Sequence, residues 1–141
     1  MSEAVDAKYA PLDVITIGRA SVDLYGQQIG SRLEDVTSFA KSVGGCPANI
    51  AIGTARLGLR SALLTRVGNE QFGRFLREQL GREGVDLDGL KTDPERLTAL
   101  AILSVESDKS FPLLFYRENC ADMEEALQYV EGELQGLLQR R

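Results

Sequence analysis

The stretch Gly44–Ala51, which reads GGCPANIA, decides the fold because it joins a strand candidate to a helix. Pro47 suits the first turn of a helix, where its missing N–H would have no partner anyway. Glycines directly before a helix N-terminus let a ligand approach backbone N–H groups that carry partial positive charge. Asn49 adds a side chain that both donates and accepts hydrogen bonds, as a hydroxylated ligand requires. Taken alone, the same residues also fit a tight turn with a solvent-facing Asn49.

Strands and helices alternate on both sides of this stretch. Two strands are predicted before it, at Leu12–Gly18 and Ser21–Tyr25, with a weaker candidate at Val36–Val43. The helix that it opens is expected to end at Gly58, a residue type that commonly follows a helix C-terminus. A further strand is predicted at Ser61–Val67.

A second helix follows, and Asn69 is expected to cap its N-terminus. Its apolar face is formed by residues at helical spacing, namely Phe72, Phe75, Leu76 and Leu80. Leu97–Val105 and Phe111–Arg117 are then predicted to form a hairpin around a polar turn at residues 106–110. Asp122–Arg141 is predicted to be an amphipathic helix, with an apolar stripe of Met123, Ala126, Leu127, Val130, Leu134, Leu137 and Leu138.

This order of elements predicts an α/β fold in which helices cover a parallel sheet and the hairpin adds a β-sheet flap. The length of 141 residues fits a single domain, 1–141, with residues 1–10 as a polar tail. The apolar stripe of the terminal helix is expected to belong to the core, and to become a partner surface if no further chain covers it.

Composition and charge exclude several classes of function. A net charge of −5 argues against nucleic acid or an anionic membrane as partner, since both need clustered Lys and Arg. Because the chain has no histidine, Ser–His–Asp catalysis and His-bound zinc are excluded, and no metal site is predicted. Cys46 and Cys120 are expected to be buried free thiols. The chain is expected to be cytoplasmic, because no signal sequence or membrane span is recognisable.

Two charged residues are candidates for ligand binding. Asp23 follows the first strand, and a carboxylate at the carboxyl end of a strand in an open α/β sheet can accept hydrogen bonds from two hydroxyls. Arg117 ends the second hairpin strand after Phe115, so its guanidinium can hold a carboxylate while the ring packs on a carbon skeleton. Each also has a structural interpretation, Asp23 as a turn or capping residue and Arg117 as a surface residue of an edge strand.

Together these motifs resemble the PfkB (ribokinase-like) family of carbohydrate kinases. GGCPANIA, with Gly58 and Gly68 beyond it, is similar to the N-terminal signature of that family. IGRASVDLY at residues 17–25 resembles the family's opening strand and its substrate-binding aspartate. FYRENCADM at residues 115–123 resembles, more narrowly, the 5-dehydro-2-deoxygluconate kinases of inositol catabolism, and related 2-keto-3-deoxygluconate kinases use an aromatic-x-Arg to hold an acid substrate.

This resemblance, which covers residues 12–123, implies the N-terminal half of a ribokinase-like α/β sandwich with a β-sheet lid. It implies a substrate site that includes Gly44 and in which Asp23, Gly45 and Asn49 hold sugar hydroxyls. In that site Phe115 packs on the substrate and Arg117 meets its carboxylate. It also implies ATP with Mg²⁺ as the phosphoryl donor, and transfer to a primary hydroxyl of a keto-deoxy sugar acid.

The sequence departs from the family because it holds no GAGD-like run, which supplies the catalytic base and the anion hole. No catalytic residue is therefore assigned in this chain, which is expected to be a truncated sugar-acid kinase that is inactive alone. One alternative is a non-catalytic sugar-acid-binding module that forms a homodimer through the lid strands or the terminal helix. Another is a truncated product that folds poorly, because half a sheet leaves an edge exposed.

Overall fold

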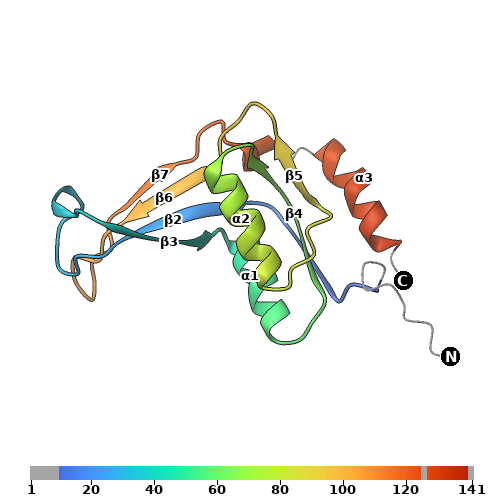
Figure 1. Cartoon of the computed structure of the whole chain (residues 1–141), viewed down its shortest axis with the longest axis horizontal. Helices are drawn as coiled ribbons and strands as arrows, with labels where there is room; N and C mark the ends of the chain where they lie inside the picture. Colours follow the sequence, from blue (N-terminus) through green and yellow to red (C-terminus); the bar gives the residue numbers. More distant parts are fainter. Residues whose placement is uncertain (1–9, 125–126, 140–141) are drawn as a thin grey trace.

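The computed structural model describes residues 10–124 and 127–139, with the side chains of residues 124–130 outside the description. The predicted polar tail therefore lies outside the described residues except for Ala10. The elements, drawn in Figure 1, are β1 (Val14–Ile17), β2 (Ser21–Gly26), η2 (Leu33–Asp35), β3 (Phe39–Gly44), α1 (Cys46–Arg56), β4 (Ser61–Gly68), α2 (Gln71–Arg82), β5 (Leu90–Asp93), β6 (Ala99–Leu103), β7 (Leu113–Tyr116), η3 (Ala121–Glu124) and α3 (Leu127–Leu138).

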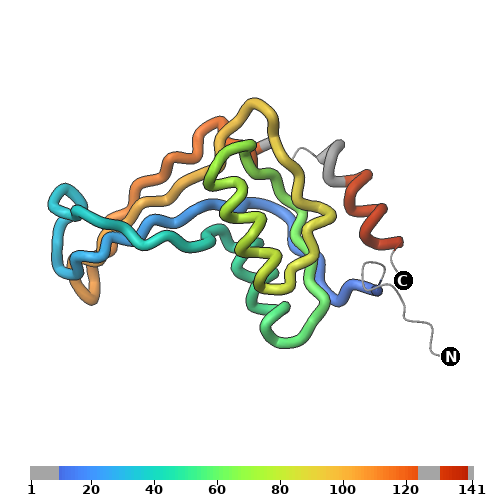
Figure 2. Tube along the Cα trace, in the orientation of Figure 1, coloured from blue at the N-terminus to red at the C-terminus, as the bar shows by residue number. Residues whose placement is uncertain are grey.

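The strands form two sheets of different character. β1, β4 and β5 make a parallel sheet in the order β1-β4-β5. The second sheet has the order β3-β2-β6-β7, in which β2 and β6 are parallel and the outer pairs are antiparallel. Figure 2 shows these four strands running side by side away from α1 and α2. The α/β class and the hairpin of β6 and β7 are confirmed, and the predicted flap is this four-stranded sheet, which we call the lid.

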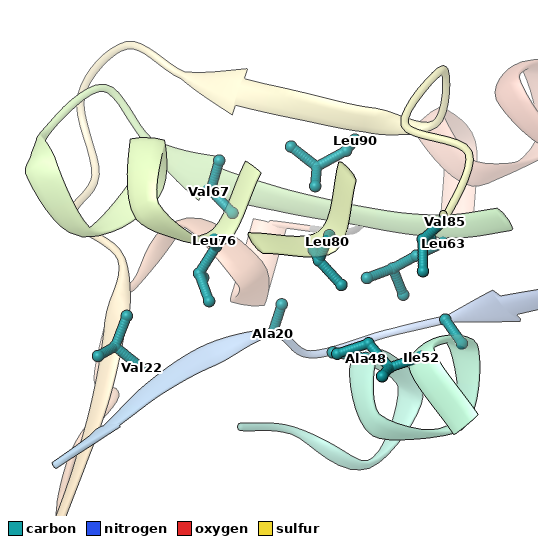
Figure 3. Packing of buried hydrophobic residues seen from close by; sticks show 11 residues of the cluster. Ala20, Val22, Ala48, Ile52, Leu63, Val67, Leu76, Leu80, Val85 and Leu90 are labelled. Atoms are coloured by element: carbon teal, nitrogen blue, oxygen red, sulfur yellow. The ribbon is translucent and has the colours of Figure 1, made fainter. Parts of the chain in front are cut away.

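Apolar residues cover both faces of the parallel sheet. Successive residues of a strand point to opposite faces, so Leu63 and Leu64 of β4 enter different clusters. Leu63 packs with Leu76 and Leu80 of α2 and with Ala48 and Ile52 of α1 (Figure 3). Ala51 of α1 belongs to the same cluster. Leu64 packs with Leu137 of α3, which is 5% exposed. Each fully buried leucine contributes about 2 kcal/mol to the free energy of unfolding.

The stripe predicted for the terminal helix is therefore partly core. Leu134 and Leu137 pack on the parallel sheet, whereas Leu138 and Met123 are exposed. The side chains of Ala126, Leu127 and Val130 lie outside the described residues. The helix also begins later than the predicted Asp122, because residues 121–124 form the short 3-10 helix η3 instead.

The cap of α2 was predicted wrongly. Asn69 precedes the cap, and Glu70 is the N-cap residue, whose carboxylate accepts hydrogen bonds from the N–H groups of Phe72 and Gly73. The same carboxylate accepts from the backbone N–H and the hydroxyl of Thr98, next to the lid strand β6. Glu70 caps the helix in place of Asn69, because the longer Glu70 side chain reaches both the N-terminus of α2 and the segment before β6.

Other boundaries follow the sequence more closely. Gly58 adopts φ +88° just beyond α1, as the helix stop requires. β3 spans Phe39–Gly44, slightly later than the predicted Val36–Val43. The strand β5 was not predicted. It follows α2 along the chain and pairs with β4 in the parallel sheet.

Candidate functional site

A pocket of about 640 Å³ lies between the inner face of the lid and the start of α1. The lid contributes residues of β2, β6 and β7, and apart from Leu100 they alternate along each strand, as expected for one face of a sheet. Five of the six predicted site residues line it: Asp23, Gly45, Asn49, Phe115 and Arg117. Its other lining residues are Gly18, Arg19, Ser21, Tyr25, Cys46, Pro47, Ala99, Leu100, Ala101, Leu103, Phe111, Leu113 and Asp122.

Strand register places the polar and apolar groups of the pocket in a row across the lid. Asp23 of β2 is paired with Ala101 of β6, which in turn is paired with Phe115 of β7. Ala101 is small, so it leaves space between the carboxylate and the aromatic ring. The register thus gives the pocket an acidic side, an open centre and an aromatic side.

Asp23 is half-buried, and its carboxylate lies against Gly44 of the neighbouring strand. A β-carbon at position 44 would overlap that carboxylate, so glycine is required there to leave room for it. Burial raises the pKa of Asp23, and a hydrogen bond from the Ser21 hydroxyl at 3.2 Å partly opposes the shift. Gly44 does not line the pocket; it supports the residue that does.

Gly45 brings the start of α1 to the pocket. It is the N-cap residue of α1 with φ +93°, a conformation that side chains rarely adopt, and a β-carbon would collide with the carbonyl of Arg19. Pro47 occupies the first turn as predicted. Asn49 is exposed and lines the pocket one turn into the helix. The positive end of the α1 dipole therefore faces the cavity.

Phe115 and Arg117 act as one unit at the end of β7. The guanidinium carbon of Arg117 lies 3.7 Å from the centroid of the Phe115 ring, which is a cation–π contact. Both side chains line the pocket. The guanidinium therefore lies over the ring, and both side chains stay exposed to an incoming ligand.

An ion pair in the same pocket was missed by the sequence analysis. Arg19 donates from Nε to Oδ2 of Asp122 at 2.9 Å and from Nη2 to Oδ1 at 3.1 Å. Both residues lie within stretches that carry the family resemblance, but their separation along the chain hides the pairing. No spacing rule connects a turn after β1 with the segment after β7.

The two cysteines are free thiols, as predicted, but only Cys120 is buried. Cys46 is exposed and lines the pocket, because the first turn of α1 opens toward the cavity. Over the residues that the structure describes, no three His, Cys, Asp or Glu side chains gather closely enough to hold a metal ion. In that same part of the chain, no helix is long and apolar enough to cross a membrane.

Comparisons with known proteins give this geometry a context. Residues 12–136 match the family model described as pfkB family carbohydrate kinase. A 5-dehydro-2-deoxygluconokinase of Geobacillus thermodenitrificans is 41% identical over 114 residues, which cover 80% of this chain and 34% of that protein. The chain therefore spans about a third of the length of the curated relatives it matches.

Solved structures agree with the sequence match. An uncharacterized sugar kinase of Pyrococcus horikoshii, in complex with ATP, superposes with a TM-score of 0.72 at 35% identity, over 77% of this chain and 35% of that one. A putative ribokinase II of E. coli has a TM-score of 0.80 at 24% identity, over 91% of this chain and 41% of that one. These likenesses confirm the expected ribokinase-like α/β fold. Because the family model matches most of the chain, the chain belongs to the pfkB family of carbohydrate kinases.

Proposed function

We propose that this chain forms the sugar-binding side of an ATP-dependent kinase for 5-dehydro-2-deoxygluconate or a related keto-deoxy sugar acid. One observation carries the proposal: Asp23 and Arg117 line one pocket from β2 and from the end of β7. The names of the curated relatives support the substrate class.

The pocket suits a molecule with hydroxyls at one end and a carboxylate at the other. β6 separates β2 from β7, so two strand spacings, roughly 10 Å, lie between their backbones. Asp23 receives one hydrogen bond from Ser21, and its remaining acceptor positions suit sugar hydroxyls. Arg117 suits the carboxylate, because a guanidinium binds carboxylates in bidentate fashion. Together, Phe115 and Ala101 offer an apolar surface that suits the carbon skeleton of the sugar acid.

The residues that the structure describes leave the nucleotide site unassigned. The described residues hold no cluster that fits Mg²⁺, and the whole sequence holds no GAGD-like run. We therefore assign neither ATP nor Mg²⁺ to any residue here. In a kinase of this family, ATP would supply the phosphoryl group for a primary hydroxyl of the sugar acid, and Mg²⁺ would neutralise charge on its phosphates. The 141-residue chain alone is expected to bind the sugar acid without turning it over.

Calorimetry on the purified chain tests this function. We expect 5-dehydro-2-deoxygluconate to bind with measurable heat, and D-fructose, a neutral ketose, to bind at least about tenfold more weakly because it lacks the charge that Arg117 recognises. A coupled assay for ADP with the same preparation is expected to show no turnover. Equal affinity for acid and ketose would overturn the substrate class, and ordinary turnover would overturn the inactivity of the chain alone.

A second candidate function is a non-catalytic binding module that pairs with a copy of itself through the lid. The outer face of β7 favours it, because Leu114 and Tyr116 are 49% and 60% exposed. The terminal helix favours it less, since Leu137 is buried against the parallel sheet. Light scattering with gel filtration tests it: a dimer that Leu114→Lys converts to a monomer supports pairing through the lid, and a monomeric wild type rejects it.

A further inference from the structure

The ion pair of Arg19 and Asp122 joins three segments at one end of the pocket. Arg19 lies in the turn between β1 and β2, and Asp122 lies in η3 after β7. Besides its two bonds to the carboxylate, Arg19 donates from Nη2 to the carbonyl oxygen of Arg117 at 3.4 Å. The guanidinium therefore contacts the backbone of the very residue that is proposed to recognise the substrate carboxylate.

Burial makes this pair rigid. The side chain of Asp122 is 1% exposed, and a buried carboxylate requires a charged or hydrogen-bonded partner. The Arg19 side chain is 33% exposed, because its remaining surface faces the pocket. The parallel bonds to both carboxylate oxygens hold the guanidinium in one orientation.

The charged residues at this end of the pocket differ in whether their charge is neutralised by a partner. Arg19 and Asp122 neutralise each other, so their pair adds order rather than net charge. The Arg117 guanidinium lies over the face of the Phe115 ring, and its charge stays available to a ligand. A cation that is already held in place loses little conformational freedom when an anion binds to it, which favours affinity.

We infer that Arg19, fixed by Asp122, is a positioning residue that sets the selectivity of the pocket for acids by holding the end of β7 and with it Arg117. This inference rests on the proposed function of Arg117. Arg19 acts through Arg117 and not on the reacting atoms. Asp122 fixes Arg19, and the Arg117 guanidinium lies over the Phe115 ring.

The test compares Arg19→Lys with Arg60→Lys. Lysine keeps the positive charge but cannot make the bidentate contact. Arg60 is a matched control, because it binds both carboxylate oxygens of Asp13 at 3.1 and 3.0 Å and does not line the pocket. For each protein, calorimetry gives the affinity for 5-dehydro-2-deoxygluconate and for its methyl ester, which lacks the negative charge and carries one added methyl group.

We expect Arg19→Lys to lower the acid-to-ester affinity ratio about tenfold, the effect of one charge-assisted hydrogen bond, and to leave the ester affinity unchanged. Arg60→Lys is expected to leave both affinities unchanged. If lysine destabilises the chain, the double variant Arg19→Met with Asp122→Leu removes both charges together and avoids an unpaired buried carboxylate. It is expected to show the same loss of selectivity. An unchanged ratio, or an equal loss of acid and ester binding, overturns the inference.

A measurement without ligand separates this inference from the proposed function. The ¹⁵N NMR signal of the Arg117 Nε–H group, assigned by its loss in Arg117→Ala, reports the order of that side chain. We expect a rigid group in the wild type and a mobile one in Arg19→Lys. If the wild type shows no preference for acid over ester, the proposed function fails, whereas an Arg117 signal unaltered by Arg19→Lys overturns the positioning role.

Discussion

The carboxylate of Asp23 occupies the space into which a β-carbon of Gly44 would project, so the two residues on neighbouring strands fit only because one has no side chain. Asp23 thereby lies against the backbone of β3, and it lines the pocket. This contact links the glycine motif before α1 to the acidic residue of the first lid strand.

Gly44→Ala is expected to abolish this arrangement. The added methyl group displaces the short Asp23 side chain, so we expect the affinity for the sugar acid to fall at least about tenfold, as for the loss of a charged hydrogen-bonding group. Calorimetry measures the affinity, and thermal unfolding checks the fold.

Gly53→Ala is the matched control for this substitution. A β-carbon at Gly53 meets nothing within 4 Å, and the residue lies inside α1. Alanine there is expected to raise the free energy of unfolding by about 0.5–1 kcal/mol and to leave sugar binding unchanged. Wild-type affinity in Gly44→Ala would contradict the role given to the Asp23 contact.

Local patterns in the sequence were sufficient where one segment decides its own structure. The helical spacing of Leu76 and Leu80, and the glycine that stops α1, identify helices because both signals act within a few residues. β5 was missed because LKTD has no strand-like apolar alternation. It becomes a strand through pairing with β4, where Leu90 lies opposite Thr65. Pairing of this kind is a tertiary effect that a local pattern does not contain.

The same difference between local signals and tertiary effects applies to the residues of the site. Arg117 was recognisable because it ends a predicted strand, and Asp23 because it follows the first predicted strand in a stretch that carries the family resemblance. The partner of Arg19 was not, because Asp122 lies 103 residues away and only the fold brings the two together. Glu70 was missed as a cap for another reason, since its neighbour Asn69 is the residue type that local statistics favour.

Arg117→Ala is expected to lower the affinity for 5-dehydro-2-deoxygluconate about tenfold to hundredfold, the range for a lost hydrogen bond to a charged group. Binding of the methyl ester is expected to change little, because Phe115 still covers the carbon skeleton. Competition calorimetry with the two ligands measures both effects. The control is Arg82→Ala on the exposed surface of α2. Undiminished acid binding in Arg117→Ala would remove the assignment of an acid substrate.

Glu70 predicts a pH dependence of stability. Burial raises the pKa of Glu70, but hydrogen bonds from the Thr98 hydroxyl and from the backbone of Phe72, Thr98 and Gly73 outweigh it, so the pKa is lower than the ordinary value. In the window between the folded and unfolded pKa values, the unfolded chain binds more protons. The stabilisation by Glu70 is therefore fully present above the unfolded pKa near 4.5 and is lost as the pH falls through the lowered folded pKa.

Glu70→Gln is expected to reduce this acid sensitivity and to lower the free energy of unfolding at pH 7 by about 1 kcal/mol, the usual cost of weakening a helix cap. Urea unfolding at pH values from about 3 to 7, which include the range in which carboxylates titrate, measures both changes. Glu34→Gln, at an exposed position of η2, is the control. The same pH profile in Glu70→Gln and wild type would show that other carboxylates dominate the acid response.

The two thiols offer a test of the pocket that needs no mutation of a ligand-binding residue. Cys46 is exposed on the pocket wall, whereas Cys120 is buried. Burial raises the pKa of the Cys120 thiol, the charge of Asp122 raises it further, and Arg19 opposes them, so its reactive thiolate is scarce. Iodoacetamide is therefore expected to modify Cys46 first, and saturating 5-dehydro-2-deoxygluconate is expected to slow that reaction because the ligand fills the same pocket.

Mass spectrometry of peptides follows the modification of each cysteine. Cys46→Ser is the control for the fast reaction, and denaturant should make Cys120 as reactive as an ordinary thiol. D-fructose at the same concentration should protect Cys46 less than the sugar acid does, since Arg117 contributes only to binding of the acid. If the sugar acid binds in calorimetry yet leaves the rate at Cys46 unchanged, the ligand lies outside this pocket, and the roles proposed for Asp23 and Arg117 fail together.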